Sequence, residues 1–169
     1  TVFGKKIDMP IFLSPTAMQR LYHHEGDKAS ARAAEKFGTF YSMSTMANNT
    51  IEEVADISNG PKLFQLYVHK DQSITDDLID RCKVSGFNGM CLTVDTLVAG
   101  NRERDHRTGF TTPPKLTLQS LISFAMRPEW VFNYFTHKKF ELSNVKNKTD
   151  KGTNISKSVI EYINEQYDP

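Results

Sequence analysis

The chain has 169 residues, of which 38% are hydrophobic and 24% are charged, and its formal net charge is +1. This hydrophobic fraction, with eleven phenylalanines, suffices for a globular domain with a buried core and excludes a mainly disordered chain. A net charge this small provides no general attraction to nucleic acid, so we expect no nucleic-acid partner. Two cysteines are too few for a disulfide framework or a cysteine metal site. We therefore expect no metal and a reduced, cytoplasmic location.

The sequence carries no signal for secretion or for crossing a membrane. It begins at Thr1, and no basic segment followed by an apolar segment comes after it, so we expect no signal peptide. We also expect the chain to be a piece of a longer protein. The most apolar late stretch, residues 118–135, is interrupted by Arg127-Pro128-Glu129, which argues against a simple spanning helix. Its leucines, phenylalanines and Trp130 are compatible with docking on the inner face of the cell membrane, or with covering a core.

Predicted strands and helices alternate along the first hundred residues. Strands are expected at residues 9–14, 39–43, 61–68 and from 90 onward, and helices at 25–37, 50–60 and 73–85. The run from Thr50 to Glu53 has the capping-box pattern, and Gly38 and Gly86 follow the ends of two helices. A repeat of this kind predicts right-handed β-α units that build a parallel sheet.

This alternation stops near residue 100. Residues 101–155 are expected to form one long loop after the fourth strand, amphipathic or irregular over 116–135, and residues 156–169 to begin the following helix. A complete (β/α)8 barrel takes roughly 250 residues. The sequence therefore predicts an α/β fold in which residues 1–100 form the first half of a TIM barrel, with an open sheet edge.

Polar or special residues follow each of the four predicted strands. In a parallel barrel these strand ends lie on one rim, where binding sites are built. Residues two apart on a strand point to the same side of the sheet. If these polar side chains face the inside of the barrel, a polar ligand would have to supply partners for their hydrogen-bonding groups. The alternative is a rim that is wetted by water and binds nothing. The residues concerned are Pro15, Thr16, Ala17, Ser42, Ser44, Gln65, Tyr67, Thr93 and Asp95.

Two further groups stand outside the strands. Arg102 lies in a mixed-charge run that is either a solvated loop or, through its guanidinium, a clamp for a carboxylate. His23 and His24 are neighbours, and adjacent histidines do not naturally share a metal geometry. We expect them to cap a helix start instead.

Several multi-residue motifs stand in order between Thr1 and about Leu118. They are Pro15-Thr-Ala-Met-Gln-Arg20, His23, Glu25-Gly26, Ser44, Glu52-Glu53-Val54, Phe64-Gln-Leu-Tyr67, Leu92-Thr-Val-Asp-Thr96, Arg102-Glu103 and Phe110 to Leu116. Together they resemble the motifs of the FMN-dependent α-hydroxy acid dehydrogenases. This family includes the flavin-type L-lactate dehydrogenases and glycolate oxidase, and the later run from Met126 to Trp130 resembles the bacterial L-lactate branch.

The resemblance implies a TIM barrel that holds FMN at the carboxyl-end rim and oxidises a 2-hydroxy acid such as L-lactate to a 2-keto acid. Tyr67 and Arg102 would hold the substrate, and Asp95 would support the catalytic imidazolium. The implied FMN-binding residues are Pro15, Thr16, Ala17, Ser44, Gln65 and Thr93. The implied partners are an electron acceptor (a quinone, a cytochrome or oxygen) and further copies of the full-length protein in a homo-oligomer.

Two departures from the family pattern matter. Met46 stands where glycolate oxidase-like members carry Trp, and none of the five histidines matches the catalytic base. We therefore expect the 169 residues alone to be inactive. Two alternatives stay open: another 2-hydroxy acid oxidase such as a glycolate oxidase, or a non-catalytic barrel fragment whose loop binds a membrane or a partner.

Overall fold

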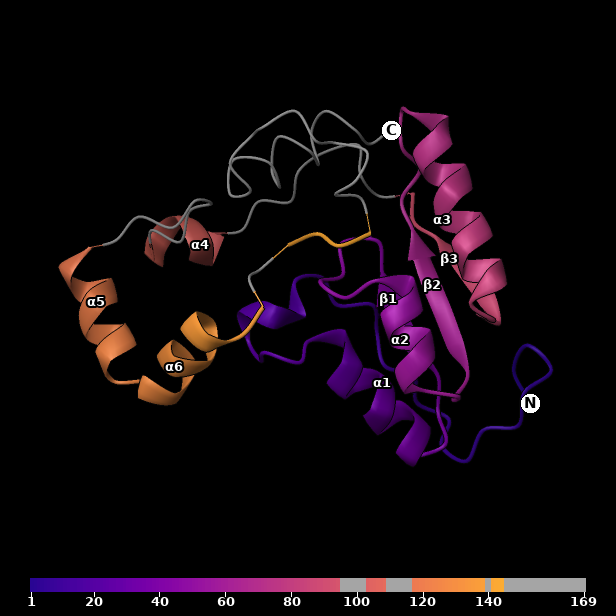
Figure 1. The fold of residues 1–169 in the computed structure, drawn as a ribbon, viewed down its shortest axis with the longest axis horizontal. Helices are drawn as coiled ribbons and strands as arrows, with labels where there is room; N and C mark the ends of the chain where they lie inside the picture. Colours follow the sequence, from indigo (N-terminus) through magenta and orange to yellow (C-terminus); the bar gives the residue numbers. More distant parts are fainter. Residues whose placement is uncertain (95–102, 109–116, 139–140, 145–169) are drawn as a thin grey trace.

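The computed structural model describes residues 1–94, 103–108, 117–138 and 141–144. In this part of the chain a short 3-10 helix, η1, precedes three strands and six α-helices (Figure 1). Their bounds are η1 Gln19–Leu21, α1 Asp27–Lys36, β1 Tyr41–Ser44, α2 Ile51–Ile57, β2 Lys62–Leu66, α3 Gln72–Val84, β3 Gly89–Leu92, α4 Glu103–Thr108, α5 Leu118–Ala125 and α6 Pro128–Thr136.

The three strands form one parallel sheet in the order β1-β2-β3. Because the strands are parallel and sequential, their carboxyl ends lie along one edge. The register aligns Ser44 with Gln65 and Gln65 with Cys91, so Thr93 follows directly at the end of β3. The predicted alternation of strands and helices is therefore observed, and it brings three of the polar strand ends together.

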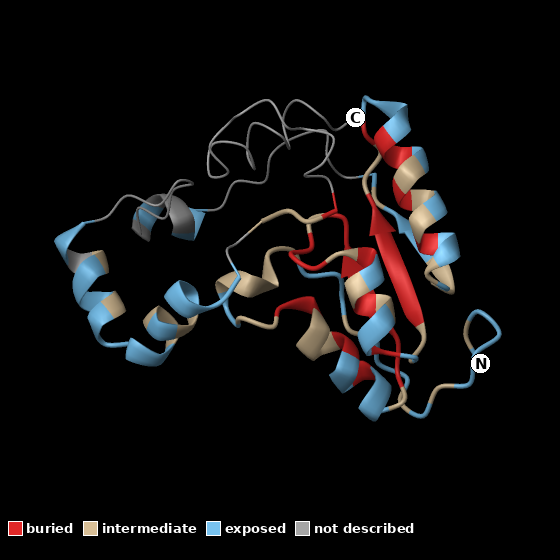
Figure 2. Cartoon of the chain, viewed as in Figure 1, coloured by how far each residue is buried: buried red, intermediate tan, exposed pale blue. Residues whose placement is uncertain are grey.

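The hydrophobic core lies between the sheet and the helices α1, α2 and α3. Figure 2 shows buried residues along β2 and on one side of α3. Leu78 of α3 and Phe64 of β2 are fully buried within this cluster. Its members are Ala31, Ala34, Tyr41, Met43, Ala47, Ile51, Val54, Phe64, Leu66, Ile74, Leu78 and Cys82.

Local signals in the sequence explain the limits of the helices. The Thr50 hydroxyl accepts from the backbone N–H of Glu53 (3.1 Å), whose carboxylate accepts from the N–H of Thr50 (3.1 Å), so the predicted capping box is confirmed. Gly38 has φ +63° directly after α1, a left-handed conformation that side chains disfavour.

Two expectations about strands were wrong. The run 9–14 does not form an extended strand but makes a single parallel bridge, in which Leu13 bonds Phe40 O (3.0 Å) and Ser42 N (3.1 Å). Pro10 and Pro15 flank it and have no N–H to continue the ladder. The apolar run that begins at Met90 is typical of a buried strand, yet Leu92 is 57% exposed, because no described strand pairs with the outer edge of β3.

Within the segment expected as a long loop, residues 101–155, the structure describes the helices α4, α5 and α6. Figure 1 shows α5 and α6 at the opposite end of the molecule from α3. The Trp130 indole of α6 donates to the Leu21 carbonyl (2.8 Å) and is stacked between Phe124 and Tyr134, with ring centroids 5.4 and 5.2 Å away. No helix in the described ranges is long and apolar enough to cross a membrane. The predicted helix at 156–167 lies outside the described residues.

A buried carboxylate, Asp27, joins the start of α1 to the loop after β1. Its oxygens accept from the backbone N–H groups of Asn48 (3.1 Å) and Asn49 (3.2 Å) and from the Tyr41 hydroxyl (2.8 Å). Burial raises the pKa of Asp27, and these hydrogen bonds partly offset that rise. Burial also raises the pKa of Tyr41, which keeps its hydroxyl protonated as a donor. The network fixes the loop that leaves β1.

We predict that Tyr41→Phe lowers the free energy of unfolding by about 1–3 kcal/mol, because it removes a donor to a buried carboxylate without changing the packing. Urea unfolding at neutral pH measures this. The control is Tyr22→Phe, since Tyr22 is 78% exposed. Equal stability of the two variants would contradict the importance of the Asp27 network.

Candidate functional site

Three of the predicted site residues form one hydrogen-bonded chain across the carboxyl ends of the sheet. The Ser44 hydroxyl donates to Gln65 Oε1 (3.2 Å), and Gln65 Nε2 donates to Thr93 Oγ1 (2.8 Å). Ser44 and Gln65 are buried and Thr93 is half-buried. Each residue ends or follows a different strand, so the sheet register itself places them side by side.

Thr45 reinforces this edge and was missed from the sequence. Its hydroxyl donates to the Gln65 carbonyl (2.6 Å) and accepts from the Tyr67 N–H (3.1 Å). These bonds tie the loop after β1 to the end of β2 and hold the Gln65 backbone in place. The available sequence signal was a hydroxyl residue directly after Ser44, although such residues more often bond their local backbone.

The loop with Pro15, Thr16 and Ala17 is anchored next to the same edge. Its following residue, Met18, donates its N–H to the Met46 carbonyl (3.2 Å), two residues beyond the end of β1. Pro15 and Thr16 are exposed and Ala17 is half-buried. The Gln19 side chain donates to the Thr16 carbonyl (3.3 Å), which also holds the carboxyl end of the loop, while the bridge at Leu13 holds the chain before it.

The remaining predicted site residues are placed only in part. Tyr67 follows the end of β2 and is half-buried against the core. Asp95 and Arg102 lie outside the described residues, so their positions at the site remain predictions. The histidines were expected to cap a helix, which is wrong: the N-cap of α1 is Gly26, and no side chain bonds there. The His23 Nδ1 instead accepts from the Glu25 N–H (3.3 Å), within a turn.

The chemistry of this edge fits the flavin that the resemblance implies. A flavin ring carries carbonyl and nitrogen acceptors as well as one N–H donor. Ser44, Gln65 and Thr93 supply hydroxyl and amide groups that can both donate and accept. The three form a neutral array on adjacent strands, flanked by the anchored loop at residues 15–17. In the absence of a charged group, such an array can hold a planar polar ring by hydrogen bonds.

Relatives of known activity align with much of this chain. Glycolate oxidase 1 of Zea mays is 46% identical over 120 residues, which cover 71% of this chain and 32% of the plant enzyme. L-lactate oxidase of Nostoc sp. is 39% identical over 149 residues, which cover 82% of this chain and 41% of that enzyme. The chain thus spans between a third and two fifths of the length of these curated relatives.

Solved structures agree with the fold. The crystal structure of the monotopic membrane protein (S)-mandelate dehydrogenase matches with a TM-score of 0.86 and 28% identity, over 99% of this chain and 44% of that one. A Pediococcus acidilactici protein described as a (putative) lactate oxidase matches with a TM-score of 0.60 and 35% identity, over 71% of this chain and 33% of that one. The predicted partial (β/α)8 barrel is confirmed by this likeness.

The match to a protein family covers the chain from its first residue to its last. All of residues 1–169 match the FMN-dependent dehydrogenases, and FMN is the cofactor that this match implies. The motifs, the parallel half-barrel and the relatives agree with this match. The chain belongs to the FMN-dependent dehydrogenase family, and the relatives named above are 2-hydroxy acid oxidases.

Proposed function

We propose that the protein containing this chain oxidises a 2-hydroxy acid to a 2-keto acid with FMN, and that L-lactate is its substrate. The observation that carries the proposal is the hydrogen-bonded chain of Ser44, Gln65 and Thr93 at the carboxyl edge of the sheet. Its donors and acceptors suit the flavin ring, with the peptide groups at 15–17 beside them. L-lactate is favoured because the alignment with an L-lactate oxidase runs over 149 residues, further than the 120 shared with the plant glycolate oxidase.

Three residues of this chain would bind the substrate or support the catalytic base. The chemistry that FMN would supply, when bound, is that of an acceptor for a hydride equivalent from the α-carbon of the substrate. Arg102 would bind the substrate carboxylate through two parallel hydrogen bonds, and the Tyr67 hydroxyl would also hydrogen-bond the 2-hydroxy acid. Asp95 would accept from the imidazolium N–H of the catalytic base and stabilise its charge. Because no histidine here matches that base, we propose that it comes from outside these 169 residues.

The substrate alternatives differ at the side-chain pocket. Met46, directly after the Ser44-Thr45 pair, replaces the Trp of glycolate oxidase-like members, and its N–H bonds the Ser44 hydroxyl (3.2 Å). A flexible thioether there leaves more room than an indole, which suits a substrate larger than glycolate. Turnover of L-lactate, glycolate and (S)-mandelate by the full protein separates the three. Preference for glycolate would overturn the choice of L-lactate.

We predict that Gln65→Met lowers FMN affinity by at least about tenfold in the full protein. The change keeps the volume of the side chain but removes the amide that joins Ser44 to Thr93, and a buried hydrogen-bonding group is worth about 1–3 kcal/mol. The recovery of flavin fluorescence on dilution measures release. The control is Gln72→Met, since Gln72 is an exposed residue at the start of α3. Unchanged FMN retention in Gln65→Met would contradict the assignment of the site.

A peripheral membrane location is a second part of the proposal. Large apolar side chains on α5 and α6 are exposed, among them Leu118 (79%), Phe132 (66%) and Phe135 (79%). Figure 2 shows that most of these two helices is exposed. The Phe124-Trp130-Tyr134 stack holds the helices together, so the apolar side chains form a rigid surface. The relative described as a monotopic membrane protein matches 99% of the chain, which favours a bilayer as the occupant.

We expect the double variant Phe132→Ser/Phe135→Ser to lose at least about tenfold in vesicle binding, since burying each phenylalanine contributes about 1.5–3 kcal/mol. Co-sedimentation of the full protein with phosphatidylcholine and phosphatidylglycerol vesicles measures binding. Phe37→Ser is the control, because Phe37 is 60% exposed at the end of α1, away from the hairpin that α5 and α6 form. Equal sedimentation of all three proteins would remove the membrane proposal.

A further inference from the structure

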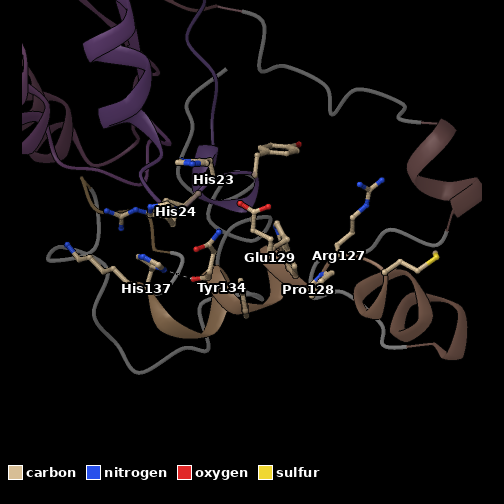
Figure 3. Close-up of a pocket in the computed structure, with 13 residues that line it drawn as sticks. His23, His24, Arg127, Pro128, Glu129, Tyr134 and His137 are labelled. Carbon is tan, nitrogen blue, oxygen red and sulfur yellow. Dashed lines mark hydrogen bonds between the residues drawn. The ribbon is translucent and has the colours of Figure 1, made fainter.

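A pocket of about 410 Å³ lies between η1 and α6, away from the strand-end site. Its walls come from residues 20–24 and from residues 126–138, and they include none of Ser44, Gln65 or Thr93. Figure 3 shows His24 and His137 at one end of this pocket, and Arg127 at the other end. The proposed flavin site does not use these side chains.

The surroundings of the Arg20 side chain indicate that a ligand binds next to it. Its Nε and Nη1 atoms are buried, and in the described part of the chain they have no hydrogen-bond partner. Arg20 as a whole is half-buried, and withdrawing part of its guanidinium from water without an acceptor is costly, since the positive charge loses hydration and gains nothing in return. The backbone around it is fixed, because the Arg20 N–H donates to Asn48 Oδ1 (3.0 Å).

Gly26 makes the space for the Arg20 side chain. Its φ is +58°, and a Cβ at this position would lie 2.9 Å from Arg20 Cγ and 2.9 Å from Asn49 Oδ1. Any other residue at position 26 would therefore be both strained and in collision with the arginine stem. The missing side chain at position 26 thus leaves the space in which the Arg20 stem lies.

Three imidazoles line the same pocket as Arg20. The His24 ring has the rings of His23 and His137 as neighbours, with centroids 4.4 and 4.1 Å away, and His24 Nδ1 is a further buried atom without a partner in the described chain. Burial, then His137 and His23, lower the pKa of His24, while Glu25 opposes the shift. A positive charge on His24 is therefore disfavoured in the empty pocket, and an anion bound nearby would offset that penalty.

The charges around the pocket are predominantly positive. Arg127 and Lys138 also line it, and Glu129 is the one carboxylate among the lining residues. Lys138 is partly neutralised by Glu53 (3.3 Å), and Glu25 is occupied by Arg32 (2.6 Å). Among the described residues no three His, Cys, Asp or Glu side chains are arranged to hold a metal ion.

We infer that this pocket binds a phosphate-class anion through the Arg20 guanidinium and the imidazoles of His24 and His137. Arg20 lies in η1, His24 follows that helix, and His137 directly follows α6. Donors from separate segments suit the tetrahedral oxygens of a phosphate better than the two coplanar oxygens of a carboxylate. The anion is either a free phosphate or the phosphate of a lipid headgroup. The second source would place the pocket at the base of the exposed α5-α6 hairpin, next to a bilayer.

The test uses the full protein loaded with FMN, so that the phosphate site of the cofactor is already filled. Calorimetric titration with inorganic phosphate is expected to show binding, weakened at least about tenfold by Arg20→Gln and by His137→Gln. Lys36→Gln is the matched control, since Lys36 is an exposed cation of α1 outside the pocket, and it is expected to bind as the parent does. His137 is exposed, so its variant keeps the test valid if Arg20→Gln does not fold.

Vesicles with phosphatidylglycerol that displace phosphate from the parent protein, but not vesicles of phosphatidylcholine alone, would support the inference with an anionic lipid as the source. Phosphate binding that neither vesicle displaces would support it with free phosphate as the source. No phosphate binding by the parent, or equal affinity in Arg20→Gln and Lys36→Gln, would overturn it.

Discussion

The hydrogen bonds that Gln65 makes to both neighbouring strands are the constraint on which the proposed site depends. Its amide oxygen accepts from Ser44 at 3.2 Å and its amide nitrogen donates to Thr93 at 2.8 Å. A parallel sheet puts these side chains on one edge, and the Gln65 amide, which has both a donor and an acceptor, joins the two hydroxyls. The buried position of the amide then makes its orientation definite, because an unpaired buried amide would be costly.

The loops around this edge are held by buried polar contacts. Asp27 fixes the loop after β1 through the N–H groups of Asn48 and Asn49, and the same loop bonds Met18 through the Met46 carbonyl. The peptide groups proposed to lie beside the flavin are thus positioned by a carboxylate at the start of α1. The η1 segment next to them also forms one wall of the cationic pocket, so two proposed binding sites share a rigid element.

Much of the fold could be predicted from local patterns. The Thr50 capping box and Gly38 specify helix limits through short-range hydrogen bonds and backbone conformation, which sequence displays directly. The strand predicted at 9–14 reduced to one bridge at Leu13, because prolines on both sides remove the donors that a ladder needs. The exposure of β3 depends on what pairs with its outer edge, and no local pattern of residues 90–94 contains that information.

The site residues that could be predicted from the sequence are those that belong to recognisable motifs at the ends of strands. Ser44, Gln65 and Thr93 were found because they end successive strands, and the register then required their contact. Arg20 and Asp27 were not found, since their significance comes from burial and from partners 20 or more residues away in the chain, such as Asn48 and Asn49. The placement of Trp130 against Leu21 joins residues more than a hundred positions apart, and only tertiary packing determines it.

A crystal structure of the full protein with FMN bound tests the central claim most directly. The account predicts that the flavin ring lies against the carboxyl ends of β1, β2 and β3, within hydrogen-bonding distance of the Gln65 amide and of the Ser44 or Thr93 hydroxyl. A flavin ring bound elsewhere, with the three side chains still bonded only to one another, would contradict it.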